Sequence, residues 1–104
     1  MQPVHVLAMI TAMPGMRDKI LEEFRANVPN VHAEDGCMVY VPTIDHADAG
    51  AIQTKLGDDT FVVVETWESL DALKAHGAAP HMAAYAAKTR DMIASRVIHV
   101  LSPA

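Results

Sequence analysis

The sequence has little cysteine, few aromatic residues and no cluster of basic residues. It contains 1 cysteine, 1 tryptophan, 2 tyrosines and 2 phenylalanines in 104 residues. A lone Cys37 excludes an internal disulfide, and its place after Gly36 in an apolar run indicates a core residue rather than a reactive thiol. A core with so few rings must be built mainly from aliphatic, Ala and Met side chains.

The charge balance excludes two classes of partner. There are 13 acidic and 8 basic residues, which gives a net charge of -5. Without a basic cluster we expect binding to neither nucleic acid nor an anionic membrane. The apolar run from Val4 to Ile10 is too short to span a bilayer and has no Lys or Arg before it, so we expect a cytoplasmic protein.

Strand and helix signals alternate along the chain without repeats or linkers, so residues 1–104 are expected to form a single domain. The first strand, residues 4–13, ends at Pro14-Gly15, and a helix follows from Met16. Pro29 interrupts the helical pattern, which predicts a kink or a restart before the helical region ends at Gly36. A second strand covers residues 37–42, and Pro42 places its far end at a sheet edge or a bulge.

The second half of the chain has the same alternation. A polar segment, residues 43–59, is long for a hairpin connection, which indicates either an elaborated loop or a lid; we expect a lid, in which Ile52 and Leu56 are the residues available for burial. Residues 61–68 form the clearest strand, in which alternation places Phe61, Val63, Glu65 and Trp67 on one face. Ser69 can cap a short helix, Pro80 can begin another, and residues 96–101 supply the last strand.

The resulting order, βαββαβ, predicts an α+β fold of ferredoxin-like type. In such a fold the helices cover one face of a four-stranded antiparallel sheet. The other face would expose many apolar side chains, so we expect a second subunit to cover it in a homodimer.

One segment is more specific than these general patterns. The string WESLDALKAHGAAPHM, residues 67–82, follows FVVVE and the earlier segments PGM and EDGC. In this order the segments resemble the antibiotic biosynthesis monooxygenase family of dimeric α/β-barrel proteins. The resemblance covers nearly the whole chain and implies the dimeric α/β-barrel fold. It does not by itself imply one activity, because the family includes cofactor-free oxygenases of phenols and quinols, haem-degrading enzymes and an isomerase.

The strand before the helices supplies three candidate substrate-binding residues. Trp67 and Phe61 could wall an aromatic ligand, although packing alone would also explain them. Glu65 shares their face, and a carboxylate among valines must be paired, hydrated or protonated. A plain surface position for Glu65 remains open.

The corner between the two later helices supplies the candidate catalytic residues. His76 ends one helix and His81 begins the next, and either could serve as a general base. His81 is the better candidate, because a helix start disfavours its charged form, whereas His76 could simply cap its helix; a capping or core role remains the alternative for both. Tyr85, one turn after His81, could orient it. Arg90 is a further candidate, for stabilising an anion. Neither histidine has the spacing of a helical metal pair, so no metal is expected.

We therefore expect a cofactor-independent monooxygenase that acts on a small aromatic, phenolic or quinol-like compound with dioxygen. The resemblance also argues against haem, because Ala86 stands where haem-degrading relatives carry a ligating histidine. No nucleotide-binding motif is present, so no cofactor is expected. A non-redox isomerase or lyase, or a small-ligand-binding protein, remains the alternative.

Overall fold

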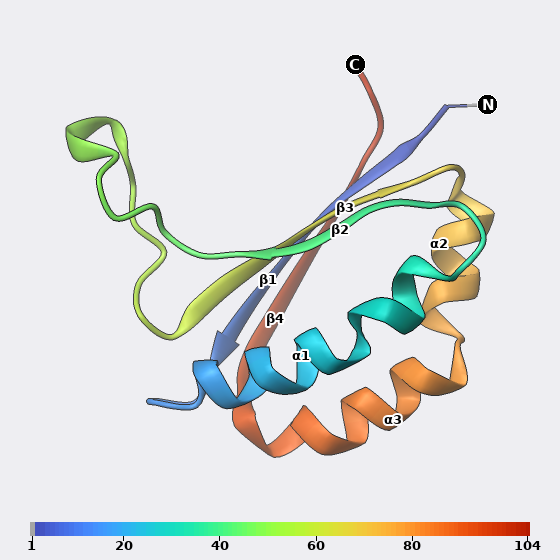
Figure 1. Ribbon diagram of the computed structural model, residues 1–104. Coiled ribbons are helices and arrows are strands. Elements are labelled where there is room, and N and C mark those ends of the chain that lie inside the picture. The colour runs from blue at the N-terminus through green and yellow to red at the C-terminus, as the bar shows by residue number, and fades with distance from the viewer. Residues whose placement is uncertain (1) are drawn as a thin grey trace.

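The computed structural model describes residues 2–104, and all helices lie on one side of a single sheet (Figure 1). The helices are α1 (Arg17–His32), α2 (Leu70–Gly77) and α3 (Pro80–Thr89), and the strands are β1 (Val4–Ala12), β2 (Cys37–Thr43), β3 (Thr60–Trp67) and β4 (Ile93–Leu101). Two short 3₁₀ turns, Gly50–Ile52 and Arg90–Met92, complete the order.

The sheet has the strand order β2-β3-β1-β4, and every neighbouring pair is antiparallel. This order confirms the ferredoxin-like βαββαβ fold predicted from the sequence. It also places β2, with Pro42, at one edge, where the missing N–H of a proline is tolerated.

Alternation along the two central strands separates a covered face from an open face. In β3, Phe61, Val63, Glu65 and Trp67 are buried, as the sequence predicted. Val6 pairs with Glu65 and Ala8 with Val63, so β1 places its buried residues on the same face. Because paired residues of neighbouring strands share a face, the remaining residues of both strands lie on the side without helices.

Helix α1 differs from its prediction at Pro29. The helix runs without a break through Pro29 to His32, so the predicted restart is wrong, and the helix ends before Gly36 is reached. A proline here removes only one hydrogen bond, close to the helix end, where few turns depend on it. Val31, which is fully buried, fixes the last turn against the core.

The segment from Ile44 to Asp59 also differs from its prediction. Ile52 is 93% exposed, and no residue of this segment lines the main cavity described below, so neither the burial of Ile52 nor the lid is borne out. The segment instead projects beyond the end of the sheet (Figure 1). Asp45 closes its base, since its carboxylate accepts hydrogen bonds from the N–H groups of Leu56 (2.8 Å) and Gly57 (2.9 Å). These bonds hold the pKa of Asp45 below its ordinary value.

The sheet face without helices carries exposed or half-buried aliphatic side chains from all four strands. They include Leu7, Val41, Val64 and Val97. Within residues 2–104, no helix combines the length and the apolar character needed to cross a bilayer.

Candidate functional site

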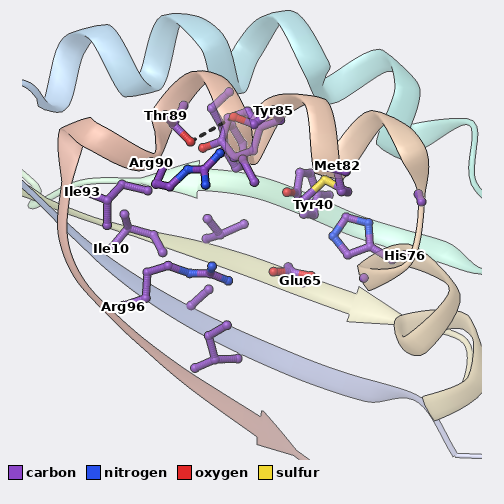
Figure 2. A pocket seen from close by; sticks show the side chains of 18 of the residues that line it. Ile10, Tyr40, Glu65, His76, Met82, Tyr85, Thr89, Arg90, Ile93 and Arg96 are labelled. Atoms are coloured by element: carbon purple, nitrogen blue, oxygen red, sulfur yellow. Dashed lines mark hydrogen bonds between the residues drawn. The ribbon is translucent and has the colours of Figure 1, made fainter.

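A cavity of about 700 Å³ lies between α3 and the covered face of the sheet. One wall is α3 with the turn before it, where Ala78, Ala79, Ala83, Ala86 and Ala87 present only methyl groups. Because these side chains are small, they leave open the space that larger residues would fill. The opposite wall is made by residues of all four strands (Figure 2).

The cavity is mainly apolar and has a few polar groups on its walls. Ile10, Met82 and Ile93 are among its apolar residues. Figure 2 shows His76 at the α2 end, Glu65 on the sheet, and Arg90 and Arg96 toward the opposite end. A mostly apolar pocket with a small number of polar groups is typical of a small-molecule site.

Glu65 is a buried carboxylate held by its neighbour on the same strand face. The indole N–H of Trp67 donates a 2.8 Å hydrogen bond to Glu65 Oε1. Burial raises the pKa of Glu65 above its ordinary value, while the Trp67 hydrogen bond and nearby His76 oppose the rise. The sequence prediction that Glu65 and Trp67 share a face is therefore confirmed, and Trp67 also fixes the carboxylate.

His76 is held by Glu34, a residue that the sequence did not single out. His76 Nδ1 lies 2.7 Å from Glu34 Oε2, and the ring packs against Trp67 at a centroid distance of 4.6 Å and against Tyr40 at 5.4 Å. A neutral imidazole that donates from Nδ1 to a carboxylate carries its lone pair on Nε2. This arrangement leaves Nε2 available as a proton acceptor.

His81 approaches the same carboxylate from α3 but does not line the main cavity. Its Nε2 lies 3.3 Å from Glu34 Oε2, yet the geometry is not that of a hydrogen bond, and among the described residues neither buried ring nitrogen has a hydrogen-bond partner. The ring instead lines a smaller cavity of about 180 Å³ between α1 and α3. Both histidines thus lie next to the carboxylate of Glu34, but His76 lines the larger cavity and His81 the smaller one.

The other predicted site residues divide into two groups. Tyr85 and Arg90 line the main cavity, whereas Phe61 and Trp67 are fully buried and are not among its lining residues. Burial raises the pKa of Tyr85 to about 12, and nearby Arg96 opposes the rise. In the described part of the chain, Tyr85 makes no side-chain hydrogen bond to His81.

Aromatic side chains connect these groups: Phe24, Tyr40 and Tyr85 line the cavity, and Trp67 lies behind its wall. Phe24 of α1 stacks on Tyr40 at 5.1 Å and contacts Tyr85 edge-on at 6.0 Å. Tyr40 in turn contacts Trp67 at 6.5 Å. Such ring pairs stabilise beyond the area they bury, so few aromatic residues suffice to fix the positions of the polar groups.

Sequence reasoning missed Glu34, Tyr40, Met82 and Arg96 as cavity or near-cavity residues. Arg96 had a usable signal, because alternation along the last strand places it on the same face as Ile98, and Ile98 pairs with buried Ala8. Glu34 had none beyond its place in the EDGC segment, since its contact with His76 joins residues 42 positions apart.

The polar groups of the described residues are not arranged as a metal site. Across residues 2–104, no three or more His, Cys, Asp or Glu side chains form a group suited to hold a metal ion. Ala86, at the position compared above with a haem ligand, lines the cavity with a methyl group and offers no ligating atom.

Comparisons with known proteins agree with one another. The family model described as "Antibiotic biosynthesis monooxygenase" matches residues 3–88. The chain is 37% identical over 100 residues to "Probable quinol monooxygenase YgiN" of Escherichia coli (strain K12), covering 94% of this chain and 95% of that protein.

Solved structures show the same fold. PA3566 from Pseudomonas aeruginosa superposes with a TM-score of 0.81 at 26% identity, covering 100% of this chain and 96% of that one. Rv0793 from Mycobacterium tuberculosis gives a TM-score of 0.78 at 27% identity, covering 98% and 95%. With the match over residues 3–88, these similarities show that the chain belongs to the antibiotic biosynthesis monooxygenase family.

Proposed function

We propose that this protein is a cofactor-independent monooxygenase that oxidises a small phenolic or quinol-like compound with dioxygen. The family and the name of the YgiN relative support a monooxygenase. The observation that carries the proposal is the placement of the Glu34–His76 pair and the Glu65–Trp67 pair beside one apolar cavity.

The reaction balances without an external reductant. A quinol loses a hydroxyl proton, and the electron-rich anion passes one electron to dioxygen. Recombination of the two radicals forms a carbon–oxygen bond, and loss of water breaks the O–O bond. One oxygen atom enters the ring, the other leaves as water with two substrate hydrogens, and the product is a hydroxylated quinone.

The protein's task is to generate and hold the anion. His76 Nε2 takes the hydroxyl proton, while Glu34 holds Nδ1–H and stabilises the imidazolium that forms. Glu65, positioned by Trp67, accepts a hydrogen bond from the second hydroxyl of a quinol. The apolar walls keep water away from the reactive pair.

His76 is preferred over His81 as the base. His76 is buried and lines the main cavity, whereas His81 lines the smaller one. His81 therefore acts on the site only through the carboxylate of Glu34.

We further propose that the working unit is a homodimer. The sheet face opposite the site at least partly exposes aliphatic residues on every strand, and a second copy presenting the same face would bury them.

Oxygen uptake with a panel of substituted hydroquinones tests the proposed reaction. The wild type should consume one dioxygen per quinol, above the rate of autoxidation. His76→Ala should lower turnover by about a hundredfold or more, the usual scale for a positioned base. Glu34→Gln should lower kcat with little change in KM, because it acts through His76. Asp35→Asn, an exposed neighbour of Glu34, is the matched control and should leave turnover unchanged.

Three results would contradict the proposal or its assignment of the base. Tight binding of quinols without oxygen uptake would favour a ligand-binding protein, and conversion without oxygen uptake would favour an isomerase or lyase. Full activity of the His76→Ala variant would remove His76 as the base.

A further inference from the structure

Two arginines line the main cavity from opposite walls. Arg90 follows α3 in the 3₁₀ turn, and Arg96 belongs to β4. Figure 2 shows both side chains extending toward the cavity, on the side of Glu65 opposite His76. Any group bound between them would contact cations on two sides.

Neither arginine is neutralised within the described chain. The ion pairs of residues 2–104 are Glu34 with His76, Glu34 with His81, and Glu23 with Lys88. No carboxylate oxygen therefore lies within ion-pair distance of Arg90 or Arg96, and this includes Glu65 in the same cavity. Both side chains are exposed and line the same cavity, so both can reach an anionic group that enters it.

Packing does not explain Arg96. It pairs with Ile10 across the strands, and Ile93 and Ile98 line the same cavity. A strand position among isoleucines favours an aliphatic side chain, and Arg96 is exposed there, so its guanidinium is accessible to an anion that enters the cavity.

We infer that Arg90 and Arg96 form a subsite for a carboxylate or similar anionic substituent on the substrate. The guanidinium group donates paired N–H groups in a plane that matches a carboxylate, and charge-assisted bonds of this type are stronger than neutral ones. The inference rests on the proposed function, because that function supplies the phenolic or quinol-type ring. Together they predict that the substrate is a phenolic or quinol-type aromatic acid.

The subsite would also orient the substrate. With the anionic group held by the arginines, the ring extends across the apolar middle of the cavity toward Glu65 and His76. Neutral quinols lack this anchor, so they should bind less tightly and in more than one orientation.

Binding of 2-naphthoate and its methyl ester, measured by calorimetry, tests the subsite. Neither probe carries an oxidisable hydroxyl, so the result does not depend on the oxygenase proposal. The wild type should bind the carboxylate at least about tenfold more tightly than the ester. Arg90→Gln and Arg96→Gln should each remove most of that preference and leave the affinity for the ester unchanged. Added salt should weaken the binding of the carboxylate and leave the binding of the ester unchanged.

Arg25→Gln is the matched control, because Arg25 is exposed on α1 and does not line the cavity. It removes the same charge and should leave both affinities unchanged. Equal binding of carboxylate and ester by the wild type, no measurable binding of the carboxylate, or an equal loss in all three variants would overturn the subsite. Failure of quinols to consume oxygen, with this preference intact, would overturn only the proposed reaction.

Discussion

At the scale of single residues, Glu65 is a carboxylate that the fold buries almost completely. Only 6% of it is exposed, and it lies among the buried aliphatic residues of β1 and β3. The carboxylate has one hydrogen bond, from Trp67, and no Lys or Arg within ion-pair distance in residues 2–104. Maintaining its charge is therefore expected to cost stability, as the raised pKa indicates.

This raised pKa gives Glu65→Gln a pH-dependent effect on stability. Between the ordinary value of 4.5 and the raised value, the folded protein binds more protons at Glu65 than the unfolded chain does, so wild-type stability falls as pH rises through this window. The glutamine side chain of the variant still accepts the Trp67 hydrogen bond but cannot ionise. The stability of the variant relative to wild type should thus increase through the window and then level off, by about 1.4 kcal/mol for each unit of pKa shift.

Thermal unfolding of the variant and the wild type, followed at increasing pH from about pH 4 until the difference levels off, measures this effect. Glu22→Gln, at an exposed position on α1, serves as the control and should show no such trend. A Glu65→Gln variant that loses stability relative to wild type as pH rises would mean that the carboxylate is stabilised in its charged form.

The sequence predicted some of these residue positions and missed others for a physical reason. Strand alternation is local, so it placed Glu65 and Trp67 on one face correctly. The environment of a histidine depends instead on which distant group approaches it. Glu34, which follows α1, contacts both His76 of α2 and His81 of α3. No local sequence pattern indicates these contacts or which of the two rings faces the larger cavity.

At the scale of elements, α2 is the segment that positions His76. Ser69 caps the helix as predicted, since its hydroxyl accepts a 3.1 Å hydrogen bond from Ala72 N–H. The first turn also packs closely against Gly36, between α1 and β2. This contact joins the segment that carries Glu34 to the helix that carries His76.

Gly36→Ala should disturb this contact. Gly36 has φ of +82°, and an added Cβ would lie 2.8 Å from the Cβ of Ala72. We expect a loss of about 1–2 kcal/mol for the left-handed backbone alone and a further loss from the clash. Gly15→Ala is the control: its φ is +77°, but an added Cβ meets nothing within 4 Å, so only the backbone cost applies. Urea unfolding measures both, and equal losses would show that the packing at Ala72 adjusts freely.

The elements themselves were largely predictable, whereas the cavity was not. Hydrophobic periodicity and turn residues located every helix and strand to within a few residues. The alanines of α3 appear in the sequence as ordinary helix formers, and only the separation of α3 from the sheet makes them the wall of an open space. The segment 44–59 was misjudged because its length suggested a lid, while Asp45 ties its two ends together away from the site.

At the scale of the whole molecule, one face of the sheet has no cover. Leu7 and Val64 are paired at its centre, on β1 and β3. Around them lie exposed Val39 and Val41 on β2, and Val97 and Leu101 on β4. An apolar surface that extends across a whole sheet is typical of a subunit interface, and a second copy offers the same surface in return.

The proposed dimer can be tested at the centre of this face. Leu7→Lys would place a charge opposite Val64, where burial in an interface leaves it without a partner, so the variant should dissociate. Sedimentation at micromolar concentration should give twice the mass of one chain for the wild type and the mass of one chain for the variant.

Leu70→Lys, at an exposed site on α2 in the helix layer, introduces the same charge and should remain a dimer. Because Leu7 is already 37% exposed in the single chain, its replacement should not prevent folding, and circular dichroism can confirm this. A wild type that sediments as a monomer, or a Leu7→Lys variant that stays dimeric, would show that the open sheet face is not the contact between subunits.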